Sequence, residues 1–530
     1  MKYASTVSGG MVVAPHFLAA EAGARVLCEG GNAIEAAIAA AATIVVAYPH
    51  MNSLGGDNFL LISDGGKPLA IDACGAAAQR ASVEFYSSRG LKAIPSRGAL
   101  AALTVAGAIS GWQLALKESK RRGGKMPLSR LFEDAIQHAR NGTIVSATLC
   151  RNTAEKLDEL KNVSGFSKTF LLEGAAPPEG HNLRLAALAS TFEQLASAGL
   201  NDFYSGDIAN SIIRELGAAG SPLLSEDLER HKALIVEPLS INLKSGTVYT
   251  MPPPTQGLAS AMILGLYERL SVSKAESFEY VHAIVEASKR AFQVRNKYVS
   301  DPNYMTIDPA QFLEAATLDK VAAEIDVKTA LPWPEISAPG DTIWLGSMDR
   351  EGCSVSLIQS IYWEFGSGLV LPETGIVWQN RGVSFGLDPT KLNSLIPGRR
   401  PFHTIHPSMA TLADGRHMVY GTMGGDGQPQ TQAAIFTRHV DFGQNLADAI
   451  AAPRWLLGRT WGEETAKLRI ENRFKAPVIE GLRNAGHDIE IVGDFDEMMG
   501  HAGAITRHID GSINGASDPR CDGAAIVGET

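Results

Sequence analysis

The residue best placed to do chemistry is a threonine, Thr342, at a point where two kinds of chain meet. The stretch before it, 331–341, holds three prolines and a glycine and is predicted to be a loop, because each proline removes a backbone donor. The residues after it, 343–349, are typical of a strand, and a turn at Asp349–Gly352 leads into a second strand over 354–360. A loop that enters a rigid hairpin is a good place for a chain to be cut. A cut before Thr342 would leave an N-terminal threonine that can act as a nucleophile. An ordinary linker gives the same local pattern, so the rest of the chain must distinguish the two interpretations.

A glycine-rich stretch, Tyr420–Gly427, follows another predicted strand. Consecutive glycines let backbone N–H groups approach a ligand closely, which favours an oxyanion hole or an anion-binding nest. No Gly-Lys-Ser/Thr follows, so the stretch is not a phosphate-binding P-loop. A tight turn without a ligand is the structural alternative.

The loop Arg399–Pro407 gathers two arginines, two histidines and a threonine before a predicted strand. A metal site would need a third ligand, and His-x-x-His in an extended chain points its rings in different directions. Binding of a small anion is the better functional interpretation, and a hydrogen-bonded loop is the structural one. Serine-hydrolase chemistry ranks low, because no Gly-x-Ser-x-Gly elbow stands between a strand and a helix.

Size and composition limit the class of protein. The 530 residues call for two or three domains or one large layered domain, and 45% hydrophobic with 20% charged residues is ordinary for a globular chain. A formal charge of −10 argues against a nucleic-acid binder. The five widely spaced cysteines, without a Cys-x-x-Cys, indicate reduced thiols, and the N-terminus lacks the apolar core of a signal peptide. The longest apolar run, 36–48, is too short to span a membrane. We therefore expect a cytoplasmic protein with no membrane partner.

The elements that must position these residues alternate between helix and strand. Helices are predicted over 15–28 and 33–48, the second apolar nearly all round and hence buried between layers. A polar loop over 49–57 and a hairpin over 58–73 follow. The next predicted helices lie near 105–120, 127–140, 150–161, 187–198, 206–219, 256–270 and 277–297. After Thr342 we predict strands at 343–349, 354–360, 374–379, 407–412 and 417–422, helices near 429–439 and 444–451, and a strand–turn–strand over 503–516. This order favours stacked sheets with helices outside.

These motifs occur together in a known family. The chain resembles the γ-glutamyltranspeptidase family of N-terminal-nucleophile hydrolases over nearly its whole length. The resemblance rests on Gly31-Asn-Ala-Ile-Glu-Ala-Ala-Ile-Ala-Ala, Pro49-His through Gly55-Gly56, Met251-Pro-Pro-Pro, Asp341-Thr342, Thr374-Gly-Ile, Arg400-Pro, Gly424-Gly425 and Gly515-Ala-Ser-Asp-Pro-Arg520. It implies an α+β fold, a four-layer αββα sandwich built from both fragments of a precursor that cuts itself. Residues 1–341 would form the large fragment and 342–530 the small one, and we expect a dimer of such heterodimers.

The resemblance also implies roles for individual residues. Thr342 Oγ would attack the carbonyl of Asp341, and the freed α-amino group, with an intrinsic pKa of about 7.7–8, would serve as base for the same hydroxyl. The N–H groups of Gly424 and Gly425 match the family's oxyanion hole. Ser360 matches a hydroxyl that contacts the nucleophile. No metal and no organic cofactor is implied.

The chain departs from the family where γ-glutamyl enzymes hold the substrate amino acid. The family's arginine for the α-carboxylate falls at Cys74, and its aspartate for the α-amino group falls at Ser384. The asparagine near the nucleophile falls at Tyr362, and the paired serines fall at His403 and Thr404. Arg381 stands beside these positions and could pair with a carboxylate.

These replacements suggest that the substrate is a small anionic amide without an amino group. Two runs, 49–57 and 252–257, resemble the oxamate amidohydrolase branch of the family, which belongs to purine degradation. The function implied is hydrolysis of oxamate to oxalate and ammonia through an acyl-enzyme. Three alternatives stay open: a γ-glutamyl hydrolase or transpeptidase, an acylase for bulkier amides, and an uncleaved ligand-binding relative.

Overall fold

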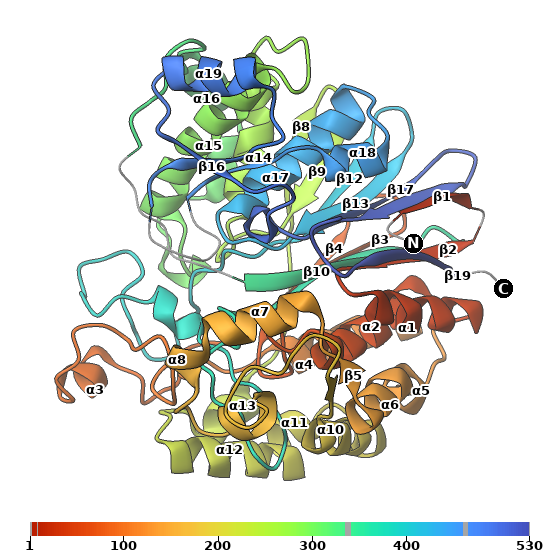
Figure 1. Ribbon diagram of the computed structural model, residues 1–530, viewed down its shortest axis with the longest axis vertical. Coiled ribbons are helices and arrows are strands. Elements are labelled where there is room, and N and C mark those ends of the chain that lie inside the picture. The colour runs from red at the N-terminus through yellow and green to blue at the C-terminus, as the bar shows by residue number, and fades with distance from the viewer. Residues whose placement is uncertain (1–2, 8, 334–340, 459–464, 529–530) are drawn as a thin grey trace.

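Two antiparallel sheets packed face to face, with helices over both outer faces, form the centre of the molecule (Figure 1). The computed structural model describes residues 3–7, 9–333, 341–458 and 465–528, so part of the predicted proline-rich loop lies outside the described residues. The first sheet has the order β1 (Tyr3–Val7), β18 (Ile513–Ser517), β17 (Ala502–Arg507), β13 (His417–Thr422), β12 (Ser408–Leu412), β9 (Gly246–Thr250) and β8 (Leu239–Leu243). The second has the order β19 (Ala524–Gly528), β2 (Gly10–Ala14), β10 (Asp341–Met348), β11 (Ser354–Tyr362), β3 (Asp57–Ser63), β4 (Leu69–Ala73) and β7 (Leu234–Val236). The predicted four-layer sandwich is confirmed.

Helices from different parts of the chain cover the two sheets. The second sheet is covered by α1 (Phe17–Cys28), α2 (Ala33–Ala47) and α4 (Ala108–Arg121). The first is covered by α14 (Gly257–Tyr267), α17 (Gly427–Phe436) and α18 (Leu446–Ala451) (Figure 1). Outside these helices pack α15 (Phe278–Tyr298), α16 (Ala315–Ala323) and α19 (Ala476–Asn484). A small sheet of β14 (Trp455–Leu457), β15 (Leu468–Glu471) and β16 (Ile489–Val492) lies beside the second group.

Further helices fill the lower half of the view, some of them against α2 (Figure 1). They are α5 (Leu128–Leu131), α6 (Glu133–Asn141), α7 (Ala147–Glu155), α8 (Leu157–Leu160), α9 (Phe166–Phe170), α10 (Ala186–Ala198), α11 (Asp202–Ser205), α12 (Asp207–Ala219) and α13 (Ser225–Arg230), with α3 (Val83–Ser87) to one side. Among the described residues, no helix is both long enough and apolar enough to cross a membrane. All five cysteines are described, and none forms a disulfide.

Helix α2 shows why the sequence folds in layers. The Asn32 side chain accepts a hydrogen bond from the Glu35 amide, and the Glu35 carboxylate accepts one from the Asn32 amide. These two bonds form a capping box at the start of the helix. Every residue of the helix is buried, because apolar side chains point in all directions between the second sheet and the outer helices. The predicted buried helix over 33–48 is confirmed.

Strand β10 divides its side chains between two cores. Ile343 and Leu345 join the core under α2, whereas Trp344 and Met348 lie in the core between the sheets. The sheets approach closely over the indole of Trp344, since a Cβ added at Gly421 or Gly503 would come within 2.2 or 2.4 Å of the ring. The same alternation places Thr342 on the side of Trp344, at the end of the layer between the two sheets.

The predicted strand over 374–379 is wrong. Within it only Val377 and Trp378 make isolated bridges, to Val370 and Gly55. Gly375 has a φ of 70°, which interrupts an extended chain. The apolar run Ile376–Trp378 is buried because it belongs to a loop that packs on the outer helices. It does not form a strand of either sheet. The other predicted strands after Thr342 correspond to β10, β11, β12, β13 and the pair β17–β18.

Candidate active site

The hydroxyl groups of Thr342 and Ser360 meet at one end of the β10–β11 hairpin. Thr342 Oγ1 donates to Ser360 Oγ at 3.2 Å, and both residues are almost fully buried. The register of the hairpin shifts between Asp341 and Ile343, so Thr342 sits at an irregularity where the regular ladder ends. The backbone of Asp341 pairs with Tyr362, which places the 341–342 peptide in the first sheet-forming residues of β10. This arrangement brings together the predicted nucleophile, its predicted partner and the predicted cleavage point.

Tyr362 has a φ of 82°, a left-handed conformation that is uncommon for a residue with a side chain. Its amide donates to Ser360 Oγ at 2.8 Å. The backbone conformation at Tyr362 therefore positions both the Ser360 hydroxyl and the Tyr362 ring. The ring faces Arg381, whose guanidinium carbon lies 3.9 Å from the ring centre.

Arg381 is a buried cation that makes no direct ion pair among the described residues. It begins a short 3-10 helix (Arg381–Ser384) and is 1% exposed. Nη1 donates weakly to Thr404 Oγ1 at 3.4 Å, and Nη2 has no hydrogen-bond partner among the described residues. Burial lowers its pKa to about 10, while the nearby Tyr362 and Asp57 oppose this shift. A guanidinium in this state is suited to receive an anion.

Asp57, at the start of β3, and His403, in the loop before β12, lie beside Arg381. Oδ1 of Asp57 accepts the amides of Gly75 and Gly107, both at 3.0 Å. Oδ2 faces His403 Nε2 at 3.5 Å, beyond hydrogen-bond distance. Burial raises the pKa of Asp57 to about 7 and holds the pKa of His403 well below its usual range. His403 is therefore a neutral imidazole in this site.

The glycine-rich stretch is tied to the same site by Gln256. Its Nε2 donates to the carbonyl of Gly425 at 2.7 Å and also to the carbonyl of Thr404. Its Oε1 accepts from Arg295, which is also paired with Asp426 at 2.6 Å. Gly424 and Gly425 have φ values of 120° and 50° and lead directly into α17. The glycine turn thus stands at the start of a helix, where partial positive charge favours an anion.

The remaining predicted pocket residues surround this group. Ser384 lies on the same 3-10 helix as Arg381, with its Oγ buried and unpartnered among the described residues. Cys74 holds a thiol, and burial raises its pKa well above the usual range, so it stays neutral. Arg400 lies next to it but is paired with Asp72 at 2.7 Å and Asp301 at 3.4 Å. A cavity of about 380 Å³ lies against Cys74, Asp72 and Arg400.

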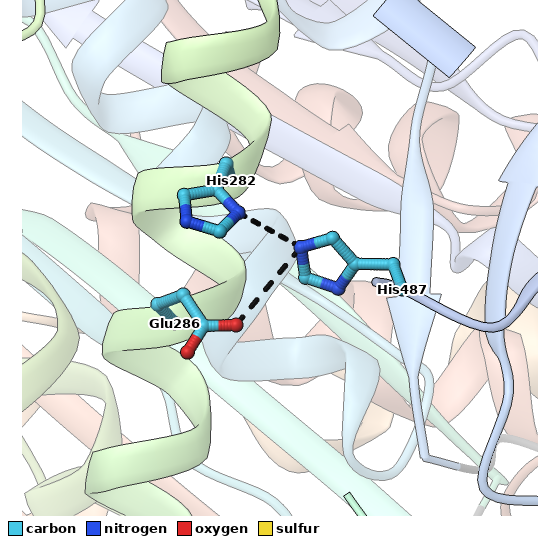
Figure 2. Close-up of side chains that lie close together, drawn as sticks. All are labelled: His282, Glu286 and His487. Atoms are coloured by element: carbon cyan, nitrogen blue, oxygen red, sulfur yellow. Dashed lines mark hydrogen bonds and ion pairs between the residues drawn. The ribbon is translucent and has the colours of Figure 1, made fainter. Parts of the chain in front are cut away.

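A different cluster has the composition of a metal site. Figure 2 shows His282 and Glu286 on α15 with His487 opposite. Among the residues described, this is the one group of three or more potential ligands whose atoms lie within 4.8 Å of one another, and it does not include His403 or His406. His282 Nδ1 lies 2.9 Å from His487 Nε2, and Glu286 Oε1 lies 3.9 Å from the same nitrogen.

The ammonium of Lys289 already forms an ion pair with Glu286, the carboxylate of this cluster. Its Nζ lies 2.7 Å from Glu286 Oε1 and donates to the carbonyl of Leu331 at 2.6 Å. Glu286 Oε2 accepts the Leu331 amide at 3.1 Å. A buried cation at this distance would repel a metal ion. The group is better described as a clamp on Leu331, at the start of the stretch that leads to Thr342.

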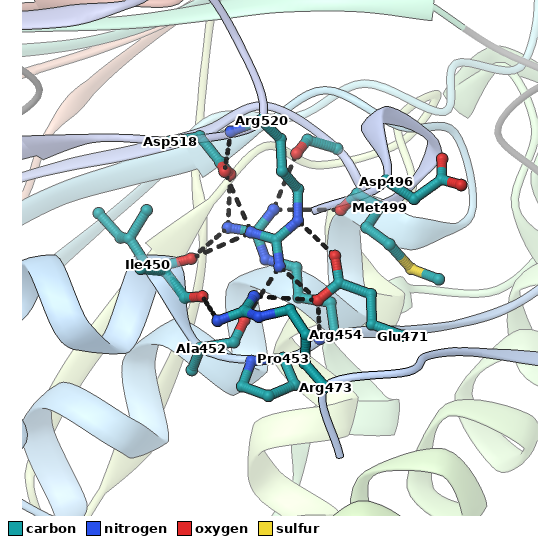
Figure 3. Close-up of polar contacts among 12 residues, drawn as sticks. Ile450, Ala452, Pro453, Arg454, Glu471, Arg473, Asp496, Met499, Asp518 and Arg520 are labelled. Carbon is teal, nitrogen blue, oxygen red and sulfur yellow. Dashed lines mark hydrogen bonds and ion pairs between the residues drawn. The ribbon is translucent and has the colours of Figure 1, made fainter. Parts of the chain in front are cut away.

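The run Gly515–Arg520 ends in an ion network, not in the pocket. Figure 3 shows Arg520 paired with Glu471 through two bonds of 2.7 Å and with Asp518 at 3.1 Å. Arg454 joins Asp518 and donates to the carbonyls of Met499 and Gly500. The next residue, His501, accepts the amide of Met423 at 3.3 Å. The network therefore supports the chain directly before Gly424.

Sequence reasoning did not single out Asp57 or Gln256. Both occur in runs that were noted for their resemblance, 49–57 and 252–257. An acidic residue directly after Gly55-Gly56, and an amide two residues after three prolines, were the signals available. Their roles depend on contacts with His403 and Gly425, which only the folded chain brings close.

Comparisons with known proteins identify the family of the chain. The sequence profile of the family described as gamma-glutamyltranspeptidase matches residues 19–528. The oxamate amidohydrolase proenzyme of Klebsiella pneumoniae subsp. pneumoniae is 51% identical, over 97% of this chain and 98% of its own. The glutathione hydrolase-like YwrD proenzyme of Bacillus subtilis is 39% identical over 97% of this chain and 98% of its own. A cephalosporin acylase from Bacillus halodurans has a similar structure, with a TM-score of 0.91 and 33% identity over 100% of this chain and 97% of its own. This chain belongs to the gamma-glutamyltranspeptidase family.

Proposed function

We propose that this chain is a precursor that cuts itself before Thr342 and then hydrolyses a small anionic amide, with oxamate as the substrate. The observation that carries the proposal is Arg381. Its guanidinium is buried, has no carboxylate within 4.0 Å among the described residues, and has one nitrogen without a partner. A buried guanidinium with an unpaired donor is costly, and a ligand oxygen that accepts from that donor removes part of the cost.

Self-cleavage begins with attack of Thr342 Oγ on the carbonyl carbon of Asp341. The peptide nitrogen becomes the free α-amino group of Thr342 and an ester links the two residues. Water then hydrolyses the ester, which frees the carboxyl group of Asp341 and restores the hydroxyl. Ser360, 3.2 Å from Thr342 Oγ1, is placed to hold that hydroxyl in line.

In the amidase reaction the Thr342 hydroxyl attacks the amide carbon of oxamate while its own α-amino group accepts the proton. The N–H groups of Gly424 and Gly425 stabilise the oxyanion, and Arg381 binds the carboxylate. The proton passes to the departing nitrogen and ammonia leaves. Water hydrolyses the oxalyl ester, so that oxalate is released and Thr342 is regenerated. No step requires a metal or an organic cofactor.

The choice of oxamate rests on the pocket and on the relatives. Tyr362 stands where γ-glutamyl enzymes carry a smaller asparagine, and neutral Cys74 stands where they carry an arginine, so a γ-glutamyl amino acid lacks its usual contacts. The Klebsiella relative that shares 51% of its residues with this chain is named for oxamate. In this proposal residues 1–341 and 342–530 are the two fragments, two such heterodimers pair, and the enzyme acts in the cytoplasm in purine degradation.

Ammonia release from oxamate, glutamine and glutathione by the purified, self-cleaved protein tests the proposal. We expect kcat/KM for oxamate to exceed that for the other two substrates by at least about 100-fold. This ratio corresponds to about 3 kcal/mol, the contribution expected from a matched carboxylate site. A chromogenic γ-glutamyl anilide serves as a parallel substrate. Turnover of the anilide with none of oxamate would overturn the assignment in favour of γ-glutamyl hydrolysis.

A further inference from the structure

The carboxyl group of Asp57 is held rigidly at the edge of the proposed anion site. Asp57 begins β3 and lies opposite Ser360 in the register with β11. Its Oδ1 is fixed by two backbone amides, while Oδ2 has no hydrogen-bond partner among the described residues and faces His403. The side chain is 1% exposed, so water does not screen its charge.

The charges around Asp57 balance before any ligand binds. Arg381 is the cation that stabilises its carboxylate, and His403 contributes no charge. The groups that also face Asp57 or His403 are the neutral Cys74 and Tyr204, the amide of Gln379, and Arg400. Arg400 is neutralised by two aspartates. Tyr362 faces Arg381, and a free α-amino group on Thr342, once formed, would be a further titratable group nearby.

Binding of an anion to Arg381 would break this balance. A substrate carboxylate on Nη2 would place a second negative charge beside the buried Asp57. Like charges in a buried site favour protonation of one of them. Asp57 is poised for this, since its pKa already lies near neutrality. Oδ2, open toward the His403 ring, is the atom that can carry the proton.

We propose that the Asp57–His403 pair takes up one proton when a small carboxylate binds Arg381, so that the site accepts the anion together with a proton. The proposal rests on the anion site of the proposed function and adds a charge-balancing role for Asp57. Asp57 and His403 are thereby positioning residues for the anion, and Asp57 does not touch the reacting amide.

The direction of the pH effect follows from this coupling. Below about pH 7 Asp57 is already protonated and binding takes up no proton. Above about pH 7 the anion must recruit the proton, and its dissociation constant rises by up to about tenfold per pH unit. The α-amino group of Thr342 titrates nearby with an intrinsic pKa of about 7.7–8 and would weaken binding in the same direction. A variant that lacks only the Asp57 carboxyl separates the two effects.

Calorimetric titration of the self-cleaved protein with oxalate, in two buffers of different ionisation enthalpy near pH 8, measures the uptake directly. We expect Asp57→Asn to take up about one proton fewer than the wild type. Asp349→Asn removes another buried carboxyl, at the far end of the β10–β11 hairpin, and should behave as the wild type. Equal uptake in Asp57→Asn and wild type would overturn the proposal.

Infrared difference spectra of the wild type give a second readout that needs no variant. Addition of oxalate should create the C=O band of a protonated carboxyl group, and loss of that signal would contradict the proposal even if Asp57→Asn failed to fold. If oxalate binds without proton uptake, the proton coupling is contradicted but the proposed function is not. If oxalate binds with proton uptake but oxamate is not hydrolysed, only the proposed function is contradicted. If oxalate does not bind, both are contradicted.

Discussion

The guanidinium of Arg381 lies over the ring of Tyr362, with its central carbon 3.9 Å from the ring centre. The contact is a cation–π interaction in a buried place, where such pairs are strongest. Because the amide of Tyr362 also donates to Ser360 Oγ, the turn that orients the ring orients the hydroxyl beside Thr342. Anion recognition and nucleophile positioning therefore depend on one short segment of chain.

Replacement of Arg381 tests the anion site. Arg381→Ala should raise KM for oxamate by about 10- to 100-fold, because charge-assisted hydrogen bonds to the carboxylate are lost. Arg381→Lys should recover part of this loss, since a lysine keeps the charge but not the planar fork. Self-cleavage, followed on denaturing gels, should change much less than KM. Equal loss of cleavage and substrate binding would instead assign Arg381 to folding.

Replacement of Thr342 tests the nucleophile. Thr342→Ala should remain a single 530-residue chain and release no ammonia, because the attacking oxygen is gone. Thr342→Ser keeps the hydroxyl but loses the branched β-carbon that limits its rotation, so it should cleave more slowly and still act. A denaturing gel and an ammonia assay check both variants. Cleavage of Thr342→Ala at the normal point would rule out this threonine.

The tether between Gln256 and the glycine turn can be tested separately. Gln256→Met leaves the carbonyls of Thr404 and Gly425 without this donor, and kcat/KM should fall at least about tenfold as the turn loosens. Gln432→Met removes another buried glutamine, bonded to Ser260, Ser408 and His406 but not to the glycine turn. If both variants lost the same activity, the effect would be general destabilisation.

The clamp on Leu331 makes a prediction about stability. Lys289→Met should destabilise the fold by about 3–5 kcal/mol, because the buried Glu286 carboxylate loses its partner. The double variant Glu286→Gln with Lys289→Met removes both charges and should be more stable than Lys289→Met alone. Thermal unfolding with and without added zinc checks this. A large zinc-dependent rise in the wild-type Tm would support a metal site at His282, Glu286 and His487.

Buried neutral histidines predict sensitivity to acid. Burial lowers the pKa of His417 to about 4, from about 6.5 in an unfolded chain. Between these values the unfolded chain binds a proton that the folded chain does not, so stability falls as the pH falls through this window. His417→Gln removes this term, and the loss of unfolding free energy between about pH 7 and pH 5 should shrink by up to about 2 kcal/mol. Denaturant titrations at the two pH values measure it, and an unchanged difference would contradict the assignment.

Local patterns predicted the elements whose environment is uniform along their length. Helix α2 is apolar on every side and β10 alternates between two cores, so both follow from the sequence. The segment 374–379 shows the limit of such patterns. Its apolar residues are buried by a loop, and burial alone does not say whether the backbone pairs with a sheet.

The candidate residues Thr342, Gly424 and Gly425 were predicted from the resemblance to the family. The local patterns alone, a loop that enters a strand and a pair of glycines, fit an ordinary linker and an ordinary turn equally well. Asp57 and Gln256 contact His403 and Gly425, which are far away in the sequence, and no local pattern encodes those contacts.

Both sheets interleave strands from either side of the 341–342 peptide bond, and the β10–β11 hairpin lies between β2 and β3. A cut before Thr342 would therefore leave two chains whose strands alternate within the same sheets. Neither could be withdrawn without stripping hydrogen bonds from both edges of the hairpin, and each alone would expose long unpaired strand edges. The two pieces would behave as one folding unit that does not exchange subunits, and folding of the intact chain must come before the cut.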